Sequence, residues 1–468
     1  MRLILLFSVT LIFSCTTKNK ESKKSPNFVL FLVDDQGWSG TSVQMSDEVD
    51  SSKSLYFQTP NLEKLASNGM RFSRGYSSSP VCSPSRYSIQ FAQSAARLKM
   101  IRVGMDTKHI NHDKQITIPK KLKEINPNYA TAHFGKWGID AEPSLLGYDY
   151  DDGQNGNKEG EFVNNKTQWE TTYSDDPKKI FSLSEKATNF LNEQKKLDKP
   201  FFLQISHYAV HTNIITEKET HNKYVKRKKV RNTDHPGFGA MNENLDEGLG
   251  IILDKLKELN LDDNTYIIYT SDNGSVPTIP ARRYYKETIN YPLSRGKWDA
   301  MEGGIRVPFI VSGPGIKKNS ESKVPVVGFD LLPTIIDLAG SKIQDLDKID
   351  GGSFKNILLG NNKNIEREYP GIIFHVPYEN KIALERAHSS IIKDNLKLIK
   401  FRNNNEIKLY DVNKDIGEKI NLSDRFPSAS SELEKLLDNY LYKYRSLRWQ
   451  EDINWKNVDV NELNSFYE

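Results

Sequence analysis

Short apolar runs alternate with helical patterns along most of this chain, and this alternation limits its fold more than any other feature. Three of the runs are continuously apolar, which is typical of strands buried on both faces of a parallel sheet: NFVLFLV (27–33), PFFLQIS (200–206) and TYIIYTS (265–271). Helical patterns lie at 60–68, 85–97, 179–195, 241–259 and 329–339. We therefore predict an α/β fold in which helices sandwich a large mixed, mainly parallel sheet.

The pattern changes after about residue 365. HSSIIKDNLKLIKF and EIKLYDV alternate around a polar turn, as in an antiparallel hairpin, and a helical pattern follows at 429–445. We predict a large domain over 26–365 and a smaller C-terminal α+β subdomain, with an antiparallel sheet, over 366–468. Residues 151–166 are rich in Gly, Asn and charge, which indicates a long surface loop.

The N-terminus has the pattern of an export signal. MRLILLFSVTLIFSC (1–15) places an apolar run after Arg2, and this run is shorter than the ~20 apolar residues of a membrane span. It resembles a bacterial lipobox with Cys15 as the lipidated residue; a plain signal peptide with an incidental cysteine is the alternative. Residues 16–25 are expected to form a flexible tether. These features predict an exported periplasmic or outer-membrane (cell-surface) lipoprotein, held to the membrane only through Cys15.

The charge balance and the cysteine content limit which partners and which cysteine chemistry we expect. The 65 basic residues nearly balance the 61 acidic ones, so we expect no nucleic-acid partner. The KRKKVR run at 226–231 fits either attraction of a polyanion or a solvated turn. Only two cysteines are present. If Cys15 carries lipid, Cys82 is left alone, and no intramolecular disulfide is expected.

Acidic and amide residues follow two of the predicted strands. Asp34-Asp35 comes after the first apolar run, and Asp272-Asn273 comes after TYIIYTS. Each pair taken singly fits a helix cap or a turn. Because ligands of open α/β sheets bind beyond the carboxyl ends of the strands, we expect the two pairs to converge there. A divalent cation would relieve their repulsion, and oxygen ligands favour Ca²⁺ or Mg²⁺ over zinc.

Two more strand ends and one helix start carry candidate functional residues. ATAHF leads to Gly135-Lys136-Trp137, and PFFLQIS leads to His207 and His211. Ser83 and Pro84 are expected to be the N-cap and first residue of the 85–97 helix, so Cys82 would lie beside the positive end of its dipole. An anionic substrate group at that point would also be attracted by Arg86.

The stretch Cys82-Ser83-Pro84-Ser85-Arg86 resembles the Cys-X-Pro-Ser-Arg signature of type I sulfatases, arylsulfatase-like members of the alkaline phosphatase superfamily that use formylglycine made from the cysteine. The chain is most similar to the bacterial, exported polysaccharide-sulfatase type. Roughly residues 26 to 425 share the resemblance, through PNFVLFLVDDQGW, SRGYSSSPVCSPSR, AHFGKWG, HYAVHT, NTYIIYTSDNG, SRGKWDAMEGGIRVPFIVSGPG and EIKLYDVNKDIGEKINL. The domain over 26–365 would then be the catalytic domain.

The resemblance implies hydrolysis of sulfate esters, most of all on a sulfated carbohydrate. It implies a Ca²⁺ site formed by Asp34, Asp35, Asp272, Asn273 and the formylglycine derived from Cys82. The formylglycine would be the nucleophile, held by Arg86, while Lys136, His211 and Lys297 contact the sulfate and His211 protonates the leaving oxygen. A maturation enzyme that generates formylglycine is the implied protein partner.

Two histidines are further candidates for substrate binding. His207 follows a predicted strand, and His375 of FHVPY could line a sugar subsite or be a hydrogen-bonded structural residue.

One position departs from the family pattern. The family commonly has histidine where this chain has Gly138, and His207, His133 or a water could take over its part in handling the formylglycine proton. Two other functions stay open: a phosphomonoester or phosphonate hydrolase on the same fold, and a non-catalytic sulfoglycan-binding lipoprotein.

Overall fold

The computed structural model describes residues 24–279, 286–361, 364–380, 386–450, 453, 455–456, 458–463 and 466–468. The predicted signal peptide, Cys15 and most of the tether lie outside these residues. Within them, no helix combines the length and the apolar character that a membrane crossing requires.

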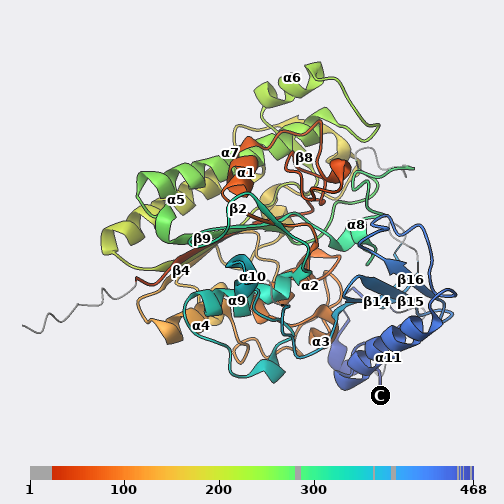
Figure 1. The fold of residues 1–468 in the computed structure, drawn as a ribbon. Coiled ribbons are helices and arrows are strands. Elements are labelled where there is room, and N and C mark those ends of the chain that lie inside the picture. The colour runs from red at the N-terminus through yellow and green to blue at the C-terminus, as the bar shows by residue number, and fades with distance from the viewer. Residues whose placement is uncertain are drawn as a thin grey trace, which may run out of the picture.

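The centre of the molecule is an eight-stranded sheet with the strand order β11–β2–β10–β9–β1–β7–β4–β5 (Figure 1). In that order the strands are Ser320–Ser322, Gly69–Phe72, Phe309–Ser312, Thr265–Ser271, Asn27–Val33, Phe201–Ser206, Ala130–Gly135 and Tyr150–Asp151. Strand β10 is antiparallel to both of its neighbours, and the other pairs are parallel. The predicted mixed, mainly parallel sheet is therefore confirmed.

Alternate residues of β1 pack into two different hydrophobic cores. Phe28, Leu30 and Leu32 join one core with helices α2 (Cys82–Phe91), α4 (Ile118–Ile125) and α9 (Leu331–Leu338). Val29, Phe31 and Val33 join the other with α1 (Pro60–Ser67), α5 (Ile180–Leu197) and α7 (Pro236–Glu258). Burial on both faces explains why these strands are continuously apolar. Figure 1 shows the sheet between these two layers.

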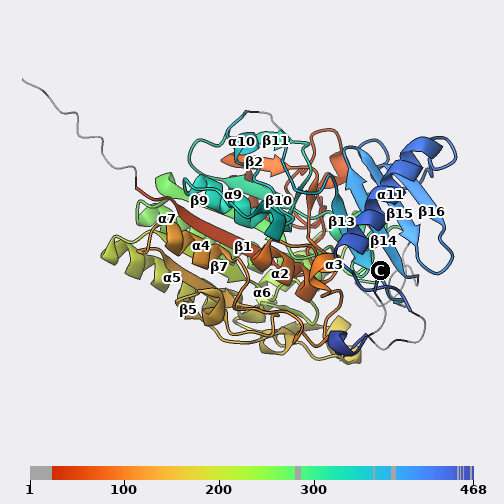
Figure 2. The ribbon, with the colours of Figure 1, turned by 90° about the horizontal axis from the view of Figure 1, so that it is seen from below.

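A second, antiparallel sheet forms the C-terminal part of the chain. Its strands pair in sequence order and are β13 (Ile372–Val376), β14 (His388–Lys393), β15 (Leu396–Phe401) and β16 (Ile407–Asp411). Helix α11 (Pro427–Lys443) packs on this sheet through Leu433 and Leu437. The sheet and α11 lie together at one side of the large sheet (Figures 1 and 2). The predicted antiparallel subdomain sheet is confirmed.

The helix predicted over 85–97 was wrong in its bounds. The structure has two helices there, α2 from Cys82 and α3 (Ala95–Leu98). Val81, not Ser83, is the N-cap of α2, and the left-handed backbone of Ala92 (φ 52°) ends it. Ser94 then caps α3 by accepting a hydrogen bond from the Arg97 amide.

The remaining strands and α-helices are β3 (Gly75–Tyr76), β6 (Thr171–Tyr173), β8 (Ile214–Thr216), α6 (Lys218–Lys226), α8 (Glu302–Ile305), β12 (Val326–Val327) and α10 (Lys355–Leu358).

A buried ion cluster ties the small sheet to the large domain. Lys397 of β15 is fully buried, and its Nζ lies 3.0 Å from a Glu302 carboxylate oxygen and 2.8 Å from one of Glu418. Glu302, the first residue of α8, also pairs with Arg306 at 2.6 Å. Because α8 begins five residues after Lys297, this cluster anchors the segment that carries Lys297.

Replacing Lys397 by methionine will remove the cation that pairs with the buried Glu418 carboxylate and one of the two cations that pair with Glu302. We expect Lys397→Met to lower the free energy of unfolding by about 3–5 kcal/mol in urea denaturation. Lys393→Met on the neighbouring strand is the matched control, because Lys393 forms only a surface ion pair with Glu432. The control should cost less than about 1 kcal/mol. Equal losses from both variants would contradict a structural role of the buried cluster.

Candidate active site

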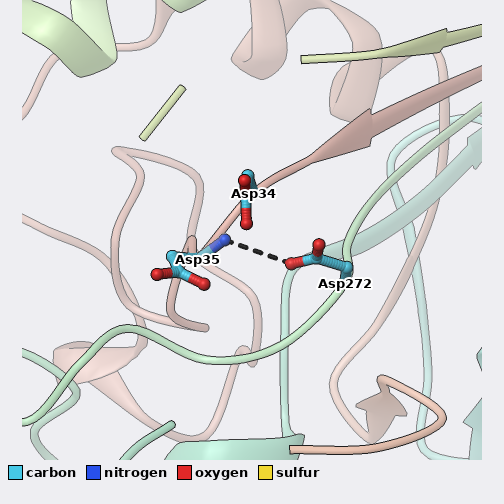
Figure 3. A group of neighbouring side chains, drawn as sticks. All are labelled: Asp34, Asp35 and Asp272. Atoms are coloured by element: carbon cyan, nitrogen blue, oxygen red, sulfur yellow. Dashed lines mark hydrogen bonds between the residues drawn. The ribbon is translucent and has the colours of Figure 1, made fainter. Parts of the chain in front are cut away.

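Three carboxylates meet where two neighbouring parallel strands end. The register pairs Val33 of β1 with Ser271 of β9, so Asp34 and Asp272 are the next residues of adjacent strands. The Asp35 amide donates to Oδ1 of Asp272 at 3.2 Å (Figure 3). Asp34, Asp35 and Asp272 are all buried, and one oxygen from each lies within 4.8 Å of the others. Strand register alone therefore brings together residues that are far apart in the sequence.

Each of the three carboxylates is paired with a buried cation. Lys136, at the end of β4, contacts Asp34. Lys297 Nζ lies 2.6 and 2.8 Å from the two oxygens of Asp35. Arg86 of α2 reaches Asp272 with Nε at 2.9 Å and Nη2 at 2.8 Å. Positive charge thus comes from three separate segments.

These cations do not remove the cost of bringing the carboxylates together. Burial, helped by the charge of Asp34, raises the pKa of Asp272 to about 6 in spite of Arg86. Burial also raises the pKa of Asp35, although Lys297 opposes it. For Asp34, burial is outweighed by the charges of Lys136, Arg86 and Lys297, which lower the pKa. Further positive charge would stabilise all three as carboxylates.

The oxygens of this group fit a hard metal ion. Oδ1 of Asp34 and Oδ1 of Asn273 are buried without a hydrogen-bond partner in the described structure. The amide nitrogen of Asn273 donates to Asp35 at 2.7 Å, which turns its oxygen away from that carboxylate. Buried oxygens of this kind need a partner, and oxygen ligands suit Ca²⁺ or Mg²⁺.

Cys82 lies beside the cation-rich side of this group. It is the first residue of α2, is 3% exposed and forms no disulfide. Burial lowers the pKa of Lys297, but the charges of Asp35 and Cys82 outweigh burial, and the net result is a raised pKa. The helix dipole adds positive potential at the same place. The position favours an anion or a nucleophile that carries negative charge.

His211 faces the same group with one ring nitrogen. Nε2 lies 3.8 Å from Asp35, and Nδ1 lies 2.6 Å from the Thr212 carbonyl oxygen. Burial lowers the pKa of His211 well below its usual value, and Lys297 lowers it further. The ring is therefore neutral here, with its proton on Nδ1 donated to Thr212 and the Nε2 lone pair facing the carboxylates.

Asn155, which no sequence motif indicated, holds the loop that carries Lys136 through hydrogen bonds to its backbone. Its side-chain oxygen accepts from the Trp137 amide at 2.8 Å, and its side-chain nitrogen donates to the Gly135 carbonyl at 2.8 Å. The Gly138 amide donates to the Asn155 carbonyl at 3.0 Å. The predicted surface loop thus also supports the site.

Gly138 stands close to Arg86 in a left-handed conformation (φ 72°). A Cβ at this position would lie 3.2 Å from Cδ of Arg86. The glycine therefore gives the arginine room to reach Asp272.

Two residues that were predicted to bind substrate are buried, apart from the carboxylates and lysines of this site. His207 is fully buried beneath it, with its ring centroid 4.5 Å from that of Phe31, and burial lowers its pKa to about 3. His375 of β13 is buried in the small subdomain, where its ring nitrogens contact Ser389 Oγ at 2.7 Å and the Leu447 carbonyl at 2.6 Å. His375 is thus the hydrogen-bonded structural residue that the sequence left open.

His133 also lies below the site rather than at its surface. It is fully buried, and its Nε2 lies 3.0 Å from Ser206 Oγ. Burial lowers its pKa to about 3, and the charge of Arg86 lowers it too.

The fold and the site together define a class of protein: an α/β enzyme in which a buried group of oxygen ligands, a helix N-terminus and buried lysines converge at the strand ends, an arrangement suited to an anionic substrate. Within that class, the chain belongs to the sulfatase family. The family model described as Sulfatase matches residues 26–341, and the model described as N-sulphoglucosamine sulphohydrolase, C-terminal matches residues 297–446. The predicted sulfatase, an enzyme that hydrolyses sulfate esters, is confirmed.

Relatives agree with this assignment, and a solved structure shares the fold. A sulfatase of Formosa agariphila is 26% identical over 90% of this chain and 88% of its own length. The N-acetylgalactosamine-6-sulfatase of Canis lupus familiaris is 26% identical, and the match spans 72% of this chain but only 66% of that protein. The structure of Ps i-CgsB with k-i-k-neocarrahexaose has the same fold, with a TM-score of 0.72, 24% identity and coverage of 89% of this chain and 93% of its own.

Replacing Gly138 by alanine will displace Arg86. We expect Gly138→Ala to lower sulfate ester turnover about tenfold, because small displacements at a reacting centre are costly. Gly153→Ala is the matched control, since Gly153 is also left-handed (φ 71°) but has open space around it. Both variants should lose about 1–2 kcal/mol of stability from backbone strain. Equal turnover in the two variants would contradict the contact with Arg86.

Proposed function

We propose that this protein hydrolyses sulfate esters of a sulfated carbohydrate, with residue 82 in the formylglycine form as the nucleophile and Ca²⁺ as the resident metal ion. The observation that carries the proposal is the convergence of an all-oxygen acidic group, Cys82 and buried cations at the ends of β1, β9 and β4. In this form the hydrated aldehyde supplies a hydroxyl nucleophile, and the metal ion supplies the charge that lowers its pKa.

The ligands proposed for Ca²⁺ are Asp34, Asp35, Asp272, Asn273 and modified residue 82. The unpartnered oxygens of Asp34 and Asn273 support this set. So does the raised pKa of Asp272, which burial causes and which a bound divalent cation would reverse.

Arg86 and the two lysines have separate roles in the proposal. Arg86, fixed by Asp272 and by the Lys136 carbonyl, orients residue 82 one helical turn before it. Lys136 and Lys297 bind the sulfate oxygens and stabilise the negative charge that develops on them. Both are 2% exposed, so solvent weakens their interaction with an anion very little.

His211 is proposed to handle the proton of the leaving oxygen. Its Nδ1 contact with Thr212 fixes the tautomer, so Nε2 is the atom that exchanges a proton with the substrate. The neutral ring accepts a hydrogen bond at Nε2 and becomes an acid only after it is protonated. A bound anion favours that protonated form.

The carbohydrate substrate and the cellular setting are also proposals. A relative is named N-acetylgalactosamine-6-sulfatase, and a solved structure of the same fold holds k-i-k-neocarrahexaose, which supports a sulfated sugar as the substrate class. Export as a lipoprotein through Cys15, to the periplasm or the cell surface, is supported by the N-terminal sequence. A formylglycine-generating enzyme is supported by the Cys82–Arg86 motif.

The reaction class can be tested with two esters of one phenol. We expect the matured protein to turn over the aryl sulfate at least a hundredfold faster than the aryl phosphate, as kcat/KM. Lys297→Met should reduce sulfate turnover by at least a hundredfold, because one buried cation leaves the anion site. Faster turnover of the phosphate would favour a phosphomonoesterase on this fold.

The nucleophile can be tested by mass spectrometry of the tryptic peptide that contains residue 82. The protein should be made in a host with the maturation machinery. We expect an aldehyde that reacts with a hydrazide probe, and no reaction in Cys82→Ala. An unmodified thiol together with retained binding of sulfated oligosaccharides would instead indicate a non-catalytic binder.

A further inference from the structure

Lys178 is a buried lysine that neither the sequence motifs nor the proposed mechanism uses. It is 1% exposed, and its Nζ donates a hydrogen bond to the Gly160 carbonyl at 2.9 Å. Among the described residues no carboxylate lies within ion-pair distance of it. An ammonium group has three hydrogens to donate, and burying one without an opposite charge is costly.

The backbone around Lys178 is strained in a way that turns this side chain inward. Lys178 and Lys179 are consecutive non-glycine residues in the left-handed region, with φ of 56° and 57°. Asp176 fixes the turn, because its carboxylate accepts the amide of Phe181 at 2.8 Å where α5 begins. The result is one buried and one exposed lysine side by side. Strain of this kind is found more often near functional sites.

The segment that holds Lys178 also touches His211. Gly160, whose carbonyl binds Lys178, packs so closely on Tyr208 that a Cβ would lie 2.3 Å from its ring. Two residues later, the Phe162 ring centroid lies 4.9 Å from that of His211. Lys178 is therefore linked to the active site through residues 160–162.

The charges of the site also act on the Lys178 ammonium. Burial lowers the pKa of Lys178 to about 7, while the charges of Asp34, Glu161 and Asp35 oppose that effect. The charge of Lys178 in turn contributes to the lowered pKa of His211, after burial and the other cations.

We propose that Lys178 is a third lysine of the sulfate pocket, which binds the sulfate group of the ester together with Lys136 and Lys297. This inference rests on the proposed function. Lys136, Lys297 and Arg86 already have carboxylate partners, whereas Lys178 has none among the described residues. A bound sulfate would supply the missing negative charge and accept its remaining hydrogens. Lys178 would also add positive charge to a site in which Gly138 replaces the family histidine.

The competing explanation is structural, with Lys178 serving only to tether Gly160. Two substitutions separate the explanations. Lys178→Met removes both the charge and the hydrogen bond, whereas Lys178→Gln removes the charge and keeps a donor for the Gly160 carbonyl. Lys179→Met is the matched control, because Lys179 has the same backbone conformation but is exposed.

The test is the affinity of the full-length matured protein for inorganic sulfate, measured by calorimetry and as competitive inhibition of aryl sulfate turnover. We expect Lys178→Met and Lys178→Gln each to raise the dissociation constant of sulfate at least tenfold, and Lys179→Met to leave it unchanged. If Lys178→Met does not fold, Lys178→Gln carries the test.

Sulfate affinity in Lys178→Gln equal to that of the unsubstituted protein would overturn the inference, as would no measurable binding of sulfate by the unsubstituted protein. The proposed function fails separately. If sulfate binding depends on Lys178 but no sulfate ester is hydrolysed, the pocket exists without the reaction. If esters are hydrolysed and Lys178→Gln binds sulfate normally, only the role of Lys178 is lost.

Discussion

The central constraint in this structure is the repulsion among three buried carboxylates that parallel strands bring together. The register of β1 and β9 leaves Asp34 and Asp272 adjacent, and Asp35 follows directly. Burial strengthens electrostatic interactions, so this group persists only with compensating positive charge. The surrounding segments provide that charge, and the remaining unpartnered oxygens are suited to a divalent cation. The proposed metal site, nucleophile and sulfate contacts thus all depend on the same balance of charge.

Charge compensation also links distant parts of the fold. Lys136 follows β4, Arg86 belongs to α2, and Lys297 precedes α8, yet all three converge on the ends of β1 and β9. Just beyond Lys297, the buried pair of Glu302 and Lys397 connects α8 to the antiparallel sheet. The C-terminal subdomain therefore helps to fix one of the cations of the site. The C-terminal subdomain contributes no carboxylate to the acidic group, but through this ion pair it helps to hold Lys297 beside that group.

The sequence predicted the parts of the molecule that depend on local pattern. Continuous apolar runs gave the buried strands, and the acidic pairs after them gave the acidic group. Other features depend on packing that no pattern records. His207 follows a strand just as His211 does, but it is buried against Phe31. The break at Ala92 and the inward turn of Lys178 both require a left-handed backbone at non-glycine residues. Asn155 belongs to a loop whose composition indicated only a polar surface segment, so no sequence pattern pointed to its contacts near the site.

The most direct test of this account is a crystal structure of the matured protein grown with Ca²⁺, with anomalous scattering used to locate the ion. The account predicts one calcium ion bound by Asp34, Asp35, Asp272 and Asn273, with residue 82 next to it and the Nζ atoms of Lys136 and Lys297 free to face a sulfate. An acidic group without an ion, in which both lysines keep their aspartate partners at saturating Ca²⁺, would contradict it.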